Sequence, residues 1–242
     1  MKTLKSFLWA ASMFCSAYAF SDNLIPNPIL PKSCNGIKEL PQKQIAYYYK
    51  HDFEKFKAYN LKITEENNNI GGEVFNFQSG KKVVYRSSIL NGNPTCLKEL
   101  TQDKNVATVI YLYNGPYVDE KEIPYQEKAL FTKDGGEFYI NVLDFDDTGH
   151  EAEITSARNH KITDIIKYIA ASPKNVLIHC LGGMHRTGLI YGVLQKCINK
   201  EKESKIIDVY KKHVGYKSKD NTGTFYQEDI DTIKAFPCDY LN

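Results

Sequence analysis

A cysteine and an arginine lie six positions apart in the segment VLIHCLGGMHRTG, residues 176–188. Three apolar residues lead into Cys180, as in a buried strand, and Gly182 and Gly183 let the following backbone turn its N–H groups inward. Such N–H groups at the start of a helix bind anions. A thiolate there is a nucleophile, and an arginine fork binds phosphate oxygens in a bidentate manner. The segment therefore predicts attack of Cys180 on phosphorus, with Arg186 holding the phosphoryl oxygens.

The elements that must position this segment alternate between strands and helices. Short apolar or β-branched runs predict strands at 83–85, 108–113, 139–143 and 176–179. Isoleucines at helical spacing predict a helix over 162–172, Asn93-Pro94 predicts a helix start, and further helices are expected at 187–198, 204–213 and 225–236. Residues 65–73, EENNNIGGE, are expected to form a loop. This alternation predicts an α/β fold with a mostly parallel central sheet flanked by helices.

The first residues are typical of a secretory signal. Lys2 and Lys5 precede an apolar run from Phe7 to Ala19, which ends in the small-x-small pattern that signal peptidase accepts. That run is shorter than the roughly 20 residues of a membrane-spanning helix. We therefore expect a signal peptide over 1–19, an N-terminal extension over 20–74 and a catalytic domain over 75–242, in a secreted or periplasmic protein.

The charge balance and the cysteines limit the partners and the redox state. Without the signal, 31 − 2 = 29 basic residues face 29 acidic ones, so no global basic field favours nucleic acid or an anionic membrane. Five cysteines stay in the mature chain: Cys34, Cys96, Cys180, Cys197 and Cys238. An odd number leaves at least one thiol free or paired between chains, and we expect Cys180 to be the free one. Cys34 and Cys238, near the two ends, are a candidate pair, with two unpaired thiols as the alternative.

The segment also resembles the signature loop of the cysteine-dependent protein tyrosine and dual-specificity phosphatases: His179-Cys180, five residues, then Arg186-Thr187-Gly188. The form HRTG followed by GLIYGVLQK, and VYRSSIL at 84–90, are similar to the atypical dual-specificity branch of plants, fungi and bacteria, which includes secreted bacterial members. The resemblance implies a dual-specificity-phosphatase-like fold and a hydrolase that needs no metal or cofactor. The larger tyrosine-specific enzymes carry a Trp-Pro-Asp triplet, whereas Trp9, the one tryptophan, lies in the expected signal.

The resemblance assigns roles to the residues that match. Cys180 would be the nucleophile, Arg186 would stabilise the transition state, Thr187 would hydrogen-bond the departing thiolate, and His179 would orient the loop. Backbone N–H groups would come from the substrate-binding positions Leu181, Gly182, Gly183, Met184 and His185. These side chains carry at most one partial charge at neutral pH, which favours phosphotyrosine or another monophosphate.

Other substrates and functions stay open. Phosphatases of multiply phosphorylated inositols tend to carry Lys or Arg in this loop, but lysines elsewhere could supply the charge. An inositol polyphosphate, an inositol pyrophosphate or a phosphoinositide is therefore an alternative. A non-catalytic phosphate-binding module would be expected to lose Cys180, Arg186 or every acid, and the Arg-Thr-Gly ending argues against a rhodanese-type sulfurtransferase. The expected partner is a phosphorylated protein or small molecule bound by a monomer.

The chemistry also needs an acid that protonates the leaving oxygen and later accepts a proton from water. The segment LDFDDTGHE, residues 143–151, supplies Asp144, Asp146 and Asp147. Asp147 is the first choice, because Asp144 is expected on the strand and Asp147 lies 180 − 147 = 33 residues before Cys180, as is usual in the family. Asp146 is a close second, and either could be a solvated loop acid.

Four more features could be functional or could have only a structural or surface role. Arg86 could bind an anionic substrate or could be structural. His150 and His160 flank the acid loop and could touch the substrate, but they are expected on the surface. The run KEKESK at 200–205 is expected to be a solvated connection between helices. No His/Cys/Asp spacing indicates a metal site.

Overall fold

A computed structural model describes residues 30–36, 42–112, 123–133, 135–140, 151–214 and 227–241. Its five-stranded sheet has the order β1-β2-β5-β3-β4. The strands are β1 Gly71–Phe77, β2 Gly80–Ser87, β3 Val106–Tyr111, β4 Glu137–Ile140 and β5 Asn175–His179. β1 pairs antiparallel with β2, and the other three pairings are parallel. The predicted α/β fold with a mostly parallel sheet flanked by helices is confirmed.

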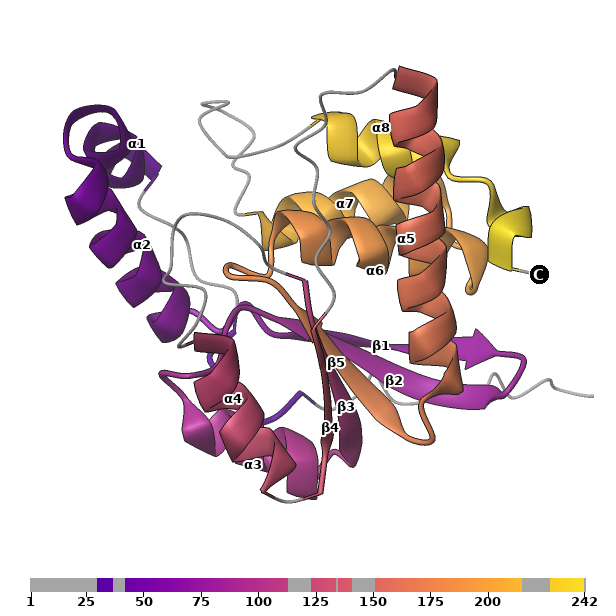
Figure 1. Ribbon diagram of the computed structural model, residues 1–242, viewed down its shortest axis with the longest axis horizontal. Coiled ribbons are helices and arrows are strands. Elements are labelled where there is room, and N and C mark those ends of the chain that lie inside the picture. The colour runs from indigo at the N-terminus through magenta and orange to yellow at the C-terminus, as the bar shows by residue number, and fades with distance from the viewer. Residues whose placement is uncertain are drawn as a thin grey trace, which may run out of the picture.

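Helices cover both faces of the sheet (Figure 1). On one face lie α3 Pro94–Gln102 and α4 Ile123–Thr132; on the other lie α5 Glu151–Ala171, α6 His185–Cys197, α7 Glu203–His213 and α8 Gln227–Ala235. A helical pair, α1 Gln42–His51 and α2 Phe53–Glu66, precedes β1, and a 3-10 turn at Cys238–Leu241 follows α8. Within the described ranges, no helix has both the length and the apolar character that crossing a bilayer would need.

Alternate residues of β5 face the two helical layers, as the strand's period of two requires. Val176 and Ile178 belong to the core shared with α5 to α8, whereas Leu177 belongs to the core shared with α3. The same alternation continues past the end of the strand. Cys180 lies in the α5–α8 core, and His179 points the other way, to Glu127 of α4. The strand register thus places the cysteine and the histidine on opposite faces.

Most predicted elements exist, with shifted ends. The expected strands at 83–85 and 176–179 lie within β2 and β5, β3 starts earlier than predicted, and residues 141–143 of the fourth strand lie outside the described residues. The helix expected at 162–172 extends back to Glu151 as α5, and α6, α7 and α8 match the other three. The helix start at Asn93-Pro94 is confirmed, because the Asn93 side chain accepts a hydrogen bond from Cys96 N. Lys205 of the KEKESK run lies on α7, where it pairs with Glu201.

The loop expected over 65–73 is wrong at both ends. α2 continues to Glu66 and β1 begins at Gly71, so the expected domain boundary at 74/75 falls inside a strand. The two glycines do not form a turn. A Cβ at Gly71 would lie 2.8 Å from the His213 ring, and one at Gly72 would lie 2.9 Å from the Tyr85 ring, so both make room for neighbouring side chains. The sequence also gave no prediction of β1, α1, α2 or α4.

Both expectations for the terminal cysteines are wrong. Disulfides join Cys34 to Cys96 and Cys197 to Cys238, so Cys34 and Cys238 neither pair with each other nor stay reduced. Closeness to the chain ends does not predict closeness in space: Cys34 lies against α3, whereas Cys238 lies at the end of α6. The prediction that Cys180 is unpaired is confirmed among the described cysteines.

Candidate active site

Cys180 follows the central strand β5 and is buried. Five residues later α6 begins at His185, and its N-cap residue Met184 makes no side-chain capping hydrogen bond. The first turn of a helix carries N–H groups without helical partners and the positive end of the helix dipole. Arg186 lies in that turn and is partly exposed, while Thr187 is buried. The thiol, the guanidinium and the helix N-terminus predicted from the sequence therefore share one loop.

The carbonyl oxygens of this loop are held from behind by donors of other segments. They are His179 O with Leu112 N at 2.8 Å, Leu181 O with Ile89 N at 2.9 Å, Gly182 O with Asn69 Nδ2 at 3.0 Å and Gly183 O with Arg86 Nη2 at 2.7 Å, whereas Met184 O accepts from Gly188 N of its own helix α6 at 2.8 Å. By contrast, no backbone N–H from Leu181 to Met184 donates to a described residue. Because the N–H and C=O of a peptide point in opposite directions, the held carbonyls turn the N–H groups into a preorganised anion cradle.

Gly183 is required by both conformation and space. Its φ of +64° lies in the left-handed region, and a Cβ there would lie 2.3 Å from Ser87 O and 2.6 Å from Ser88 N. The loop thus rests directly on the backbone that follows β2. No larger residue fits without moving one of the two segments.

Arg86 lies beneath the loop. Its buried guanidinium donates to Gly183 O and stacks over Tyr191, with 5.1 Å between Cζ and the ring centroid. Burial lowers the pKa of Arg86 to about 10, against the opposite influence of Tyr191, Cys180 and Tyr210. The group therefore stays protonated at neutral pH. Of the two roles that the sequence left open, the structure shows the supporting one, because Arg86 contacts the loop's carbonyls from below.

A second support, absent from the sequence analysis, comes from Asn69 and His213. Asn69 Nδ2 donates to both Gly182 O and His213 O, and Asn69 Oδ1 lies 3.0 Å from His213 Nδ1. Burial, followed by the charges of Arg86 and Lys212, holds the pKa of His213 well below its usual range, so its imidazole is neutral. The sequence carried no signal for this pair, since Asn69 lies in the segment expected to be a loop.

Three side chains meet at the rim of the loop. His185 Nδ1 lies 3.1 Å from Tyr210 Oη and 3.5 Å from Asp229 Oδ2, and Tyr210 Oη donates to the same carboxylate. These contacts join the first turns of α6 and α8 through α7. Asp229 was not among the candidate residues of the sequence, because nothing in its local pattern distinguishes it from other acids of an amphipathic helix.

The remaining predicted residues divide into two groups. Asp144, Asp146, Asp147 and His150 lie outside the described residues, so the choice of general acid stays a prediction. Thr187 Oγ1 is buried and makes no hydrogen bond to any described residue, and its role toward the thiolate stays a prediction. His160 is exposed on α5, as expected.

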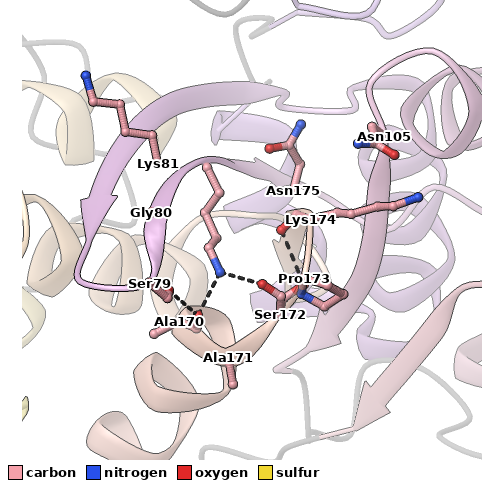
Figure 2. Close-up of a pocket in the computed structure, with 11 residues that line it drawn as sticks. Ser79, Gly80, Lys81, Asn105, Ala170, Ala171, Ser172, Pro173, Lys174 and Asn175 are labelled. Carbon is pink, nitrogen blue, oxygen red and sulfur yellow. Dashed lines mark hydrogen bonds between the residues drawn. The ribbon is translucent and has the colours of Figure 1, made fainter.

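A surface hollow of about 380 Å³ lies at the other end of β5, away from Cys180 (Figure 2). Asn175, the first residue of β5, and the end of α5 line it. Lys82 Nζ donates at the end of α5 to Ala170 O at 2.7 Å and to Ser172 O at 2.5 Å. A lysine that binds the last carbonyl groups of a helix stabilises that helix end, so these contacts give Lys82 a structural role.

The part of the chain that the structure describes contains no group of three or more potential metal-ligating side chains. The sequence-based expectation that the chemistry needs no metal and no cofactor stays a prediction.

Comparison with known proteins finds distant similarity. No protein-family model matches the chain. It is 26% identical over 182 residues to inositol diphosphatase DSP3 of Arabidopsis thaliana, which covers 73% of this chain and 77% of that protein. Similar solved structures include the core catalytic domain of PP-IP phosphatase SIW14 from S. cerevisiae, with 19% identity, 72% and 88% coverage and a TM-score of 0.49. Another is TpbA of P. aeruginosa, with 16% identity, 65% and 83% coverage and a TM-score of 0.45.

Proposed function

We propose that this protein is a cysteine-dependent phosphatase that hydrolyses phosphate monoesters through a cysteinyl-phosphate intermediate. The observation that carries the proposal is the loop after β5, where a buried unpaired thiol lies in the same loop as backbone N–H groups whose carbonyls are held from behind. That arrangement binds a tetrahedral oxyanion and offers it a nucleophile, which is what phosphoryl transfer to sulfur requires.

The reaction has two balanced steps. In the first, the Cys180 thiolate attacks phosphorus, the bond to the ester oxygen breaks, and the carboxylic acid of Asp147 gives its proton to the leaving alcohol. In the second, Asp147 takes a proton from water, the water oxygen attacks phosphorus, and the S–P bond breaks to release phosphate and the thiolate. Arg186 and the loop N–H groups bind the phosphoryl oxygens in both steps, and the Thr187 hydroxyl donates to the departing thiolate.

A metal-independent assay tests this mechanism. Hydrolysis of para-nitrophenyl phosphate with EDTA present should be abolished in Cys180→Ser and strongly reduced in Asp147→Asn, with Asp146→Asn as the matched control. A larger loss in Asp146→Asn would reassign the acid. If the reduced wild type shows no turnover from acidic to neutral pH, a non-catalytic phosphate-binding module becomes the better description.

For the substrate we propose a phosphotyrosine or similar monophosphate, because the loop side chains from Leu181 to His185 bring little positive charge. An inositol polyphosphate or inositol pyrophosphate is the second candidate, supported by the similarity to the plant inositol diphosphatase. Phosphate release from a phosphotyrosine peptide and from an inositol pyrophosphate should be compared by kcat/KM on one preparation. A higher value for the inositol compound would reverse the order.

We also propose that the protein is exported after removal of residues 1–19. Two disulfides support this, because such bonds persist mainly in oxidising compartments. Mass spectrometry of the purified native protein should find Phe20 as the first residue and two disulfides. An intact N-terminus with four reduced thiols would contradict export.

A further inference from the structure

A buried carboxylate lies against His179, on the face of the sheet opposite the nucleophile. Glu127 of α4 and His179 are both fully buried, and Glu127 Oε2 lies 3.1 Å from His179 Nε2. The separation is that of an ion pair, although the ring N–H does not point straight at the oxygen. Removing a charged carboxylate from water is costly without a compensating proton or cation. The contact is therefore attractive only if one of these two atoms carries a proton.

The other nitrogen of the same ring faces the nucleophile's own peptide. His179 Nδ1 lies 3.3 Å from Cys180 O, which can only accept a hydrogen bond, so the contact is attractive only if Nδ1 carries a proton. A neutral histidine without a partner on Nε2 could place its proton on either nitrogen. With Glu127 beside it, both contacts of the ring are attractive only when the pair holds two protons, one on Nδ1 and one on either Nε2 or the Glu127 carboxyl group.

The second oxygen of Glu127 holds another part of the loop's support. Leu90 N donates to Glu127 Oε1 at 3.1 Å, and the residue before it, Ile89, donates its N–H to Leu181 O. The same short segment contains Ser87, on whose carbonyl Gly183 rests. One carboxylate therefore contacts both the strand end that bears Cys180 and the segment that supports the loop after it.

We propose that Glu127 is a positioning residue of this active site: it keeps a proton of His179 directed at the Cys180 carbonyl and fixes the 87–90 segment beneath the loop. The proposal rests on the proposed phosphatase function, since it assigns Glu127 a role in the reactivity of Cys180. Glu127 itself touches neither Cys180 nor the phosphate cradle. The two protons of the Glu127–His179 pair stay on the pair throughout the reaction.

Two substitutions separate hydrogen bonding from packing. In Glu127→Gln, the amide oxygen can still accept from Leu90 N and the amide N–H can donate to His179 Nε2, which keeps the proton on Nδ1. Glu127→Met has a similar length but can do neither. We expect Glu127→Met to lower kcat for para-nitrophenyl phosphate about 10–100-fold, as removal of partners that orient a reactive group does. KM should change little, and Glu127→Gln should restore most of the lost kcat.

Glu99→Met is the matched control. The Glu99 carboxylate also binds backbone N–H groups, those of Lys32 and Ser33, both at 2.9 Å, but these belong to the N-terminal segment. This variant should keep the wild-type kcat. A wild-type kcat in Glu127→Met would overturn the proposal, and so would a Glu127→Gln protein that is folded yet as slow as Glu127→Met.

A spectroscopic readout distinguishes failure of this proposal from failure of the proposed function. In 15N-histidine-labelled wild type, NMR should find a proton on His179 Nδ1 at neutral pH, and Glu127→Met should show a mixture of tautomers. A wild-type His179 without that proton would refute the positioning role even if turnover is normal. If the wild type does not hydrolyse phosphate esters, the phosphatase function fails, but the NMR result and the alkylation rate of Cys180 in the variants still decide the role of Glu127.

Discussion

Replacing Gly183 with alanine should damage the loop more than an ordinary strained glycine position. Two effects add at this residue. The left-handed φ of +64° costs a residue with a Cβ about 1–2 kcal/mol. In addition, the Cβ would lie 2.3 Å from Ser87 O, and because that atom is backbone, the loop has to move away from the strand end. The movement breaks the bond from Arg86 to Gly183 O, and a hydrogen bond with a charged donor contributes about 1.5–3 kcal/mol.

Gly135→Ala is the control that isolates the first effect. Gly135 has a φ of +81°, and nothing lies within 4 Å of the added Cβ, so only the cost of about 1–2 kcal/mol applies. For Gly183→Ala the sum is about 2.5–5 kcal/mol. In a chain of this size each kcal/mol lowers the melting temperature by about 2–4 °C, so the two variants, which differ by about 1.5–3 kcal/mol, should differ by about 3–12 °C.

The assays are thermal unfolding and hydrolysis of para-nitrophenyl phosphate. Gly135→Ala should keep its turnover, whereas Gly183→Ala should lose at least about tenfold in kcat, because misplacing one oxyanion donor costs about 10²–10³ in the best-studied case. Equal melting temperatures for the two variants, or wild-type turnover in Gly183→Ala, would refute the view that the loop rests on Ser87 in a fixed conformation.

Three further results are expected. Because the native pKa of His213 is depressed, the unfolded state takes up a proton near pH 6.5 that the native state refuses. The free energy of unfolding should therefore fall as the pH drops from 7 to 5, by up to about 1.4 kcal/mol per pH unit, and less so in His213→Asn. The double variant Cys34→Ser/Cys96→Ser, which opens a 62-residue loop, should lose about 4 kcal/mol in denaturant titrations and keep its kcat. Thr187→Val should lower kcat about 10–100-fold without loss of stability, because the buried hydroxyl has no partner among the described residues in the resting protein.

Each of these results has a contradicting outcome. If the free energy of unfolding falls equally with pH in wild type and His213→Asn, another group causes the loss of stability at acidic pH. An unchanged denaturant midpoint of unfolding for Cys34→Ser/Cys96→Ser would mean that the segment before α1 contributes nothing to the cooperative fold. A strongly destabilised Thr187→Val would assign that hydroxyl a structural bond instead of one to the thiolate.

The sequence predicted the loop well because its signals are local. The run from Val176 to Gly188 contains the strand, the turn glycines and the helix start in one stretch, and strand periodicity then separates His179 from Cys180. The supports of the loop could not be found in this way. Arg86 and Asn69 meet it from 97 and 113 positions away, and such pairings depend on how the sheet is assembled. Glu127 lies on a helix that the sequence analysis did not predict.

The errors in predicting the fold from the sequence have the same origin. Gly71 and Gly72 are typical of a turn by local criteria, but they lie in β1 because side chains from other elements need the space. Disulfide connectivity likewise depends on which segments lie side by side, and distance along the chain gave the wrong pair. In both cases the deciding interaction lies in tertiary packing, which a single sequence does not show.

The position of β5 bears on how the molecule is made. Among the strands that the structure describes it is the last along the chain, yet it lies between β2 and β3, so the sheet stays in two halves until residues 175–179 have been synthesised. A nascent chain that ends earlier exposes two unpaired strand edges, which are sites of aggregation. The long sequence separation of these pairings also predicts slow folding. Since Cys180 follows directly after β5, the nucleophile enters the fold with the strand that completes it, and no shorter N-terminal fragment can have a partly formed active site.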